Sequence, residues 1–138
     1  MSIFGNTVTA RQTLRPFNLC YLATPYSKYR LGIDQAFQHA AALAAELLLG
    51  NVRVYSPICH SHPIAEYGGL DHLNHAIWLP FEERMMRVCD CLIVAHLEGW
   101  EESHGIAHEI GFFEAARKPV FDLDPDTFAL TLRGGPRA

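Results

Sequence analysis

Hydrophobic residues along the chain form two kinds of pattern, short unbroken runs and longer segments in which they recur every three or four residues. The unbroken runs, which predict buried strands, lie at 18–23, 52–55, 91–95 and 119–123. The periodic segments, which predict helices, lie at 30–49, 78–88 and from Ser103 to Ala116. Buried strands that alternate with helices are typical of a parallel sheet covered on both faces. We therefore expect an α/β fold of three layers, flavodoxin- or Rossmann-like, with a mostly parallel sheet of about four to five strands.

Three segments fall outside this alternation. Residues 1–17 have a mixed pattern and are expected to form a loose N-terminal arm. Residues 58–74, with the turn signals SHPI and YGGLDH, are expected to be irregular. The C-terminal tail, 126–138, ends in RGGPRA and is expected to fray. The remaining residues, 18–125, are predicted to be a single domain.

One predicted helix has a clear stop and a clear buried face. Gly50 and Asn51 end the helix over 30–49, because both residues favour a helix C-terminus. The face expected to point inward consists of Ile33, Phe37, Ala40, Ala41, Ala44 and Leu48.

Composition narrows the classes of partner and compartment. The chain has 138 residues and a net charge of −4, with no run of Lys or Arg that could follow a phosphate backbone, so nucleic acid is not expected as a partner. No apolar run reaches membrane-spanning length, and the first residues lack the long apolar segment of a signal peptide. The four cysteines include no CxxC pair, which favours reduced thiols and a cytoplasmic location.

An acidic residue lies in the middle of a hydrophobic helix face in the segment GWEESHGIAHEIGFFEAA, residues 99–116. On a helical wheel Glu109 lies within about 60° of the residues that ought to be buried. These neighbours are Gly105, Ile106, Phe112, Phe113 and Ala116. A buried carboxylate must be paired, or its pKa must rise. Two interpretations carry about equal weight from the wheel alone. One is a structural role, either an ion pair with Arg87 or Arg53 or an acid that caps backbone amides, and the other is a functional acid.

Gly105 shifts that balance toward function. Helical side chains lean toward the N-terminus, so the Glu109 side chain lies over position 105, where no side chain is present. A glycine inside a helix costs about 1 kcal/mol relative to alanine. A notch beside a buried acid is a plausible place for a ligand.

Ser103 has two interpretations that exclude one another only in part. It is a good N-cap for the helix that carries Glu109. Its hydroxyl and the free amides of the first turn also form a site suited to a phosphate group. Ligands in parallel α/β folds bind beyond the carboxyl ends of the strands, and Ser103 follows such an end.

Other polar residues have weaker signals. Tyr21 fits core packing, whereas Tyr26 lies on the loop after the first strand. Glu82 and Glu83 are by default solvated helix charges, and nothing decides between a loop role and a substrate contact for His62. His104 and His108, like His72 and His75, form weak metal-binding pairs, and surface histidines are favoured about four to one. We expect no metal and no organic cofactor.

Four motifs together resemble the nucleoside 2-deoxyribosyltransferase superfamily. They are YLATPYS, VYSP, CDCLIV and GWEESHGIAHEIGFFEAARKPV, and the similarity covers residues 18–123. Nearer still is a small bacterial and phage branch related to nucleoside 5′-monophosphate N-glycosidases. The most specific part is the S-x-G-x-x-x-E-x-G pattern followed by KPV.

The resemblance implies roles for individual residues. Glu109 matches the nucleophile that holds the sugar as a covalent ester. Ser103 stands where the nucleoside 5′-monophosphate hydrolases have Ser and the deoxynucleoside transferases have Asp, which favours a nucleotide substrate. Tyr21 matches the aromatic residue that lines the sugar and base site, and Glu82 lies near an Asp that acts as an acid or holds the base. Relatives form dimers or larger homo-oligomers.

The function predicted from the sequence is that of an N-glycosidase that cleaves the base–sugar bond of nucleoside 5′-monophosphates, with transfer of the sugar to a second base as a variant. Its site residues are Glu109 and Glu82 as catalytic groups and, as substrate-binding residues, Tyr21, Tyr26, Trp100, Ser103 and Gly105. Trp100, with Phe112 and Phe113, is also expected to be exposed for oligomer contact. The alternatives are a nucleotide-binding sensor without turnover and a metal-dependent hydrolase that uses His104 and His108.

Overall fold

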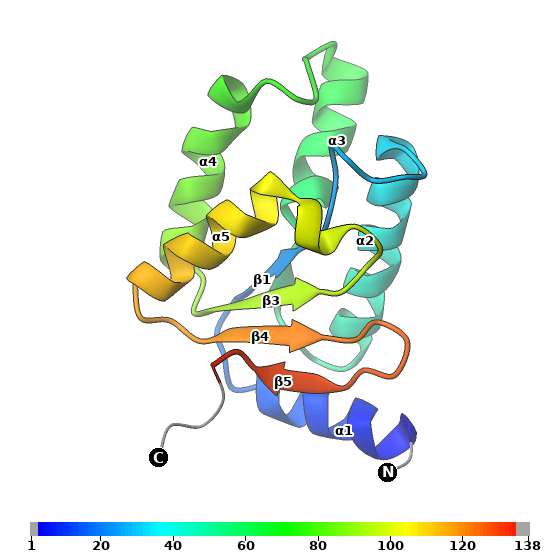
Figure 1. Cartoon of the computed structure of the whole chain (residues 1–138), viewed down its shortest axis with the longest axis vertical. Coiled ribbons are helices and arrows are strands. Elements are labelled where there is room, and N and C mark those ends of the chain that lie inside the picture. The colour runs from blue at the N-terminus through cyan, green and yellow to red at the C-terminus, as the bar shows by residue number, and fades with distance from the viewer. Residues whose placement is uncertain (1–2, 135–138) are drawn as a thin grey trace.

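The computed structural model describes residues 3–134, with side chains from residue 9, and contains one five-stranded sheet (Figure 1). The strands are β1 (Cys20–Ala23), β2 (Val54–Tyr55), β3 (Cys91–Ala95), β4 (Val120–Leu123) and β5 (Leu130–Leu132). Their order is β2-β1-β3-β4-β5, and all neighbours are parallel except β4 and β5. The predicted α/β fold with a mostly parallel sheet is therefore confirmed.

Helices cover both faces of the sheet, as three layers require (Figure 1). They are α1 (Ile3–Leu14), α2 (Ile33–Leu49), α3 (Pro57–Gly68), α4 (His75–Val88) and α5 (His104–Ala115). A short 3₁₀ turn, η1 (Trp100–Glu102), precedes α5. Within residues 3–134, no helix is both long enough and apolar enough to cross a membrane.

The sheet separates two hydrophobic cores because successive strand residues point to opposite faces. On one face α1 and α2 bury Leu14, Leu43 and Leu47 against Leu22 and Ile93. On the other face α4 and α5 pack against the alternate strand positions. The residues of this second core include Tyr21, Met86, Leu92, Val94, Ile106 and Phe113.

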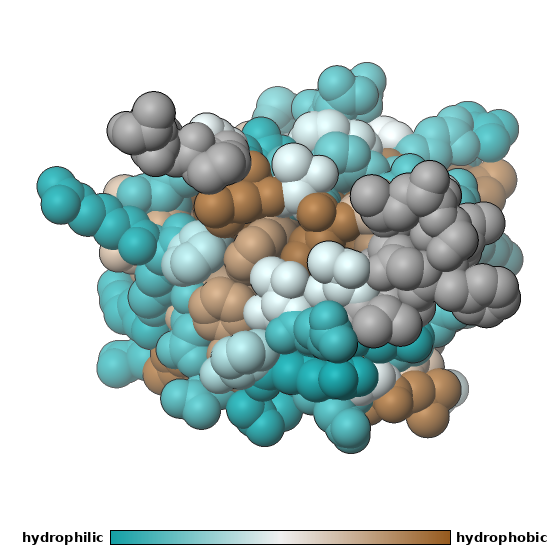
Figure 2. Space-filling model, turned by 90° about the horizontal axis from the view of Figure 1, so that it is seen from below, coloured by the Kyte–Doolittle hydropathy of each residue, from teal (hydrophilic) through white to brown (hydrophobic). Residues whose placement is uncertain are grey.

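The N-terminal segment is a helix rather than the loose arm expected from the sequence. Ala10 and Leu14 of α1 are fully buried in the first core, and Phe128 joins the same core from the C-terminal side. Burial of these residues against the sheet stabilises a helix that its mixed pattern did not indicate. Figure 2 shows the face that α1 and β5 form. On this face a small group of hydrophobic residues lies within a largely hydrophilic surface. Residues 1 and 2 of the expected arm lie outside the described residues.

The C-terminal segment also differs from the expected tail. Residues 130–132 form β5, which pairs antiparallel with β4 through Phe121↔Leu132 and Leu123↔Leu130. The compact unit therefore extends beyond 18–125 at both ends. The predicted fraying of residues 135–138 falls on positions outside the described part of the chain.

The segment 58–74 was wrongly expected to be irregular throughout. Most of it forms α3, where Ser56 is the N-cap and accepts a hydrogen bond from the Cys59 amide at 3.3 Å. Pro63 suggested a break, but burial of Ile58 and Ala65 holds the helix through it. Gly69, with φ of +69°, ends α3, so the predicted irregular loop is reduced to residues 69–74.

The predicted faces and ends of two other helices are shifted. The inward residues of α2 are Ala36, Ala40, Leu43 and Leu47. Leu48, expected inside, is 56% exposed, so the true face is rotated by about one residue. α4 begins at His75 rather than at 78, because Asn74 accepts a hydrogen bond from the Ala76 amide at 3.1 Å and caps it.

Lys118 fixes the end of α4 to the turn between α5 and β4. Its Nζ donates to the carbonyl oxygens of Met86, Arg87 and Cys89 at 3.2, 2.6 and 2.8 Å. These carbonyls lie at the end of α4, where backbone acceptors lack partners inside the helix. One ammonium group therefore satisfies three acceptors and holds α4 next to α5.

We expect Lys118→Met to lower the free energy of unfolding by about 2 kcal/mol, because three carbonyls lose a charged donor. Chemical denaturation monitored by circular dichroism measures this loss. The matched control is Arg117→Met, which removes the same charge from an exposed neighbour and should change stability by less than about 0.5 kcal/mol. Equal losses in the two variants would contradict the role assigned to Lys118.

Candidate active site

A cavity of about 150 Å³ opens where the chain leaves the carboxyl end of β1. Its walls come from the loop after β1, the start of α3, residues 72–82 and the first turns of α5. Among the residues predicted from the sequence, Tyr26, Glu82, Ser103, Gly105 and Glu109 line it. Five of the seven predicted site residues, drawn from three separate segments, thus meet at one opening.

Glu109 lies on the inner face of α5, as the wheel predicted, and is only 8% exposed. Burial raises the pKa of its carboxyl to about 8, mainly because the charged form is desolvated. Within the described chain, no basic residue forms an ion pair with it. Arg53, a predicted partner, instead donates to the carbonyl oxygens of Asn18 and Phe17. The structural ion pair considered above is therefore wrong.

Tyr21 supports Glu109 from beneath rather than lining the cavity. Its ring is fully buried between Tyr55 and Phe113, at centroid distances of 5.4 and 5.7 Å. The hydroxyl is close enough to lower the pKa of Glu109 and oppose the effect of burial, yet it lacks the geometry of a formed hydrogen bond. A small movement of either side chain would give this hydroxyl its acceptor.

Glu82 brings a second carboxyl to the cavity from α4. Burial raises its pKa, while the nearby His75 and His108 act in the opposite direction. The negative charge of Glu82 in turn contributes to the raised pKa of Glu109. The two carboxyls therefore disfavour simultaneous ionisation, as expected for neighbouring acids.

The first turn of α5 forms an open wall of the cavity. Ser103 caps the helix and accepts a hydrogen bond from the Ile106 amide at 3.2 Å. A Cβ at Gly105 would meet only the Ser103 Oγ, at 3.8 Å, which is an ordinary contact. The glycine is therefore not required by crowding, and its effect is to leave space over Glu109.

The loop after β1 contributes two polar residues that sequence reasoning missed. Lys28 Nζ lies 3.1 Å from Nε2 of His104, which lines the cavity at the start of α5. Thr24 also lines the cavity, is 6% exposed, and has a hydroxyl without a hydrogen-bond partner. The signal available in the sequence was their position directly after a buried strand.

Two further residues near the cavity come from segments that the sequence left undecided. His62 is buried on α3, and His72 lies in the loop that follows this helix. Both imidazoles contact the hydroxyl of Tyr26. This convergence depends on α3, which the sequence did not predict.

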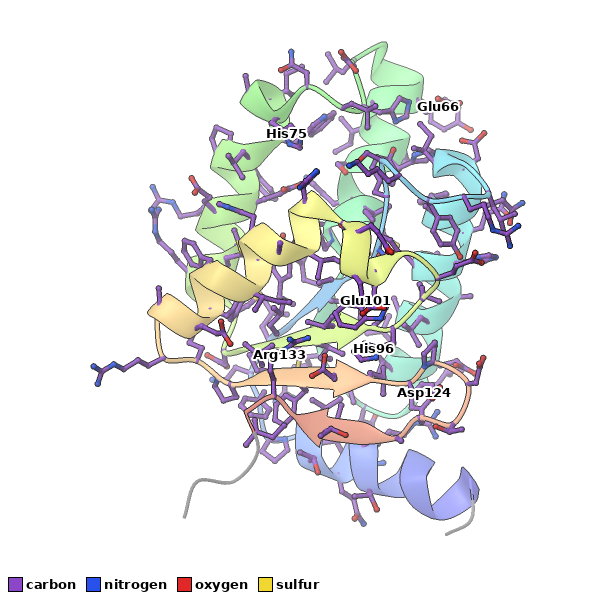
Figure 3. All side chains as sticks on the ribbon, viewed as in Figure 1. Glu66, His75, His96, Glu101, Asp124 and Arg133 are labelled. Carbon is purple, nitrogen blue, oxygen red and sulfur yellow. The ribbon has the colours of Figure 1, made fainter. Side chains whose placement is uncertain are left out.

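Trp100 lies outside the set of residues that line the cavity. Its indole stacks on His96 at 4.0 Å, and Arg133 lies over the same ring. Phe113 is fully buried and Phe112 is half-buried, so the expected exposure of this pair was wrong. Figure 3 shows His96 and Arg133 beside β3 and β4, far from Glu66 and His75 at the other end of the molecule.

The histidine pairs do not form metal sites. His104 contacts Lys28, whereas His108 lies 3.8 Å from Glu83. Across residues 3–134, no group of three His, Cys, Asp or Glu side chains is arranged to hold a metal ion. The four cysteines are free thiols, as predicted.

Comparison with known families identifies the group to which the chain belongs. Residues 18–124 match the family described as Domain of unknown function (DUF1937), which covers most of the chain. The chain is therefore a member of this family. A search of curated proteins found no match.

Because burial raises the pKa of Glu109 to about 8, its protonation should make stability depend on pH. Between about pH 4.5 and 8 the unfolded chain releases this proton before the folded protein does, so stability falls as pH rises through that window. We expect Glu109→Gln to remove this fall and to be more stable than wild type by a few kcal/mol at pH 9.

Urea unfolding at pH 5, 7 and 9 tests this prediction. Glu114→Gln is the matched control, because it makes the same change on the exposed face of α5. Its stability should follow that of the wild type at every pH. A constant difference between wild type and Glu109→Gln across the range would show that Glu109 does not titrate in this way.

Proposed function

We propose that this member of the DUF1937 family is an N-glycosidase that cleaves the base–sugar bond of nucleoside 5′-monophosphates, with 2′-deoxynucleotides as the preferred class. The observation that carries the proposal is the buried carboxyl of Glu109, which has no ionic partner among the described residues and faces a cavity whose rim is a helix N-terminus. The resemblance to the nucleoside 2-deoxyribosyltransferase superfamily supports the same residue as nucleophile.

Glu109 acts as the nucleophile in its ionised form. In the empty site its pKa of about 8 keeps most of the population protonated at neutral pH. A sugar that develops positive charge at its anomeric carbon favours the carboxylate, because opposite charges attract strongly in a site without bulk water. A small movement lets the Tyr21 hydroxyl donate a hydrogen bond to this carboxylate, which stabilises the same form.

The reaction has two steps. In the first, a carboxylate oxygen of Glu109 bonds to the anomeric carbon while the bond to the base breaks and its electron pair leaves with the base. In the second, water attacks the anomeric carbon and the ester bond to Glu109 breaks, which restores the carboxylate. The products are the free base and the sugar 5-phosphate, and a second base in place of water would give transfer.

The substrate's phosphate binds at the start of α5. The Ser103 hydroxyl and the free amides of the first turn supply neutral donors, and the helix dipole favours an anion there. Lys28, held against His104, supplies a full positive charge on the same side. Gly105 leaves room for the sugar between this phosphate and Glu109.

The base lies toward α4. Trp78 lines this side of the cavity, and its indole N–H is fixed by the Asp71 carbonyl at 2.9 Å, so it offers an oriented aromatic surface for stacking. Glu82, whose raised pKa favours the protonated carboxyl, can donate a hydrogen bond or a proton to the base. Neither a metal nor an organic cofactor enters the proposal. We further infer a cytoplasmic homo-oligomer, supported by the free thiols and by the resemblance.

We expect wild-type protein to release free base from a nucleoside 5′-monophosphate, and Glu109→Gln to lose at least 10³-fold of this activity because the amide cannot form the ester. Incubation with a panel of ribo- and deoxynucleotides and nucleosides, followed by chromatography of the free base, measures both. Glu114→Gln should be as active as wild type. No release by the wild type, with tight nucleotide binding, would replace the proposal with a nucleotide sensor.

We expect Lys28→Met to lower kcat/KM for nucleotides by about tenfold to a hundredfold, because a charged phosphate contact is lost. Activity on the corresponding nucleosides, which lack the phosphate, should change little. Arg84→Met, a charge removal on the exposed side of α4, serves as the control. An equal loss on nucleotides and nucleosides would mean that Lys28 does not bind the phosphate.

A further inference from the structure

Three buried hydroxyls around the carboxyl ends of β1 and β2 have no hydrogen-bond partner in the described part of the chain. They belong to Tyr21, Thr24 and Tyr55, and the other buried side-chain polar atoms without a partner there are two guanidinium nitrogens. A buried hydroxyl that stays unpaired lowers stability, so such groups are rare in folded proteins. Three of them beside one candidate active site therefore require an explanation.

The two phenols have carboxyl groups of the site near them. The Tyr21 hydroxyl lies close to Glu109, as described above. Burial raises the pKa of Tyr55, and the negative charges of Glu82 and Glu109 raise it further, which places both acids in the neighbourhood of its hydroxyl. The unpaired phenols are thus accounted for by the two acids that the site already contains.

Thr24 differs from both phenols because it lines the cavity itself. The residue is 6% exposed, and its hydroxyl oxygen has almost no contact with solvent, so bulk water does not replace the missing partner. A valine would fill the same space without an unpaired polar atom. A hydroxyl that the ligand-free protein does not use, in the wall of a cavity, is typical of a group whose partner arrives with a ligand.

One rotation lets the Thr24 hydroxyl exchange places with the methyl group of the same side chain. Both groups are attached to Cβ, so a turn of about 120° around the Cα–Cβ bond moves the oxygen to the position of the methyl carbon. The backbone does not need to move. A ligand that offers a hydrogen bond shifts the side chain toward the rotamer in which the oxygen faces it.

The position of Thr24 in the cavity favours the sugar as the group that it contacts. The proposed function places the phosphate at the start of α5 and the base at Trp78 of α4. Thr24 directly follows β1, whose Tyr21 lies beneath Glu109, so it is close to the part of the substrate that the acid holds. A hydroxyl both donates and accepts hydrogen bonds, and a sugar hydroxyl can therefore pair with it in either direction.

We propose that Thr24 is a substrate-binding residue that recognises the 3′-hydroxyl of the sugar. The inference rests on the proposed glycosidase function, in which 2′-deoxynucleoside 5′-monophosphates are the preferred substrates. The 3′-hydroxyl is the ring hydroxyl that such a substrate retains. A site with a buried polar group discriminates against a ligand that lacks the matching group. Thr24 therefore makes the site selective against 3′-deoxy sugars.

The test compares a 2′-deoxynucleoside 5′-monophosphate with the 2′,3′-dideoxynucleotide of the same base. We expect Thr24→Val to lower kcat/KM on the deoxynucleotide by about tenfold to a hundredfold, because the 3′-hydroxyl loses its partner. On the dideoxynucleotide the change should be less than about threefold, because this substrate never makes the contact. Each variant is measured on the same two substrates, so the different intrinsic reactivity of the two sugars cancels in the comparison.

Two controls separate the hydroxyl from the rest of the side chain. Thr24→Ser keeps the hydroxyl and should keep the preference for the deoxynucleotide. Thr131→Val makes the same change as Thr24→Val on the exposed strand β5 and should leave both activities unchanged. An equal loss on both substrates in Thr24→Val would indicate a packing role, and no loss on either would mean that the hydroxyl does not meet the substrate. Both results overturn the inference.

Thermal unfolding of the ligand-free protein tests the unpaired hydroxyl without any reaction. Because Thr24→Val removes a buried polar atom that has no partner, its melting temperature should equal that of the wild type or exceed it by a few degrees. A clearly lower melting temperature would show that the hydroxyl already has a partner inside the protein, which would overturn the inference.

A wild type that cleaves neither nucleotide would remove the glycosidase proposal, and binding would then decide the role of Thr24. The probes are 2-deoxyribose 5-phosphate and 2,3-dideoxyribose 5-phosphate, measured by calorimetry. We expect the wild type to bind the first at least tenfold more tightly, and Thr24→Val to bind the two about equally. Equal affinities in the wild type, or binding of neither sugar phosphate, would overturn the inference as well.

Discussion

The cost of burying one carboxyl group is the constraint on which the site depends. Glu109 lies on the face of α5 that packs toward the sheet, where its charged form is desolvated and no cation of the described residues compensates for it. The groups around it are neutral or acidic: the Tyr21 hydroxyl beneath and Glu82 across the cavity. At pH values above the pKa of a free carboxyl, such a residue destabilises the folded protein. This is typical of an acid that is retained for chemistry rather than for stability.

The parallel sheet is what gathers the other groups around this acid. Because β1 and β3 run in the same direction, the loops after them open on the same edge. The chain leaving β1 brings Thr24, Tyr26 and Lys28, and the chain leaving β3 brings Ser103 at the start of α5. Tyr21, within β1, reaches the same acid from below the cavity. β1 and the loop after it therefore supply both the side chain beneath Glu109 and part of the cavity wall opposite Glu109.

The sequence predicted the features that depend on residues close together along the chain. Four strands, the helix of Glu109 and the burial of that residue follow from hydrophobic spacing, and Gly105 and Ser103 follow from helix geometry. α3 was missed because Pro63 reads as a break, and only burial against the rest of the fold overrides it. The network of Tyr26 could not be predicted for the same reason, since its two histidines reach the phenol only when α3 is in place. Trp100 and Phe113 were misplaced because exposure depends on what packs over a residue.

The contact of Lys118 with the end of α4 has a consequence for how the site can vary. Lys118 joins the end of α4 to the chain that leaves α5, so the helices that carry Glu82 and Glu109 are held together at this end. The opposite end of α4 follows the loop at residues 69–74, which joins it to α3 and carries His72. Changes of length or sequence in this loop would reshape the entrance without altering the spacing of the two acids. The spacing of Glu82 and Glu109 is thus set at the joined ends of the two helices, whereas the opening of the cavity is set by the loop before α4.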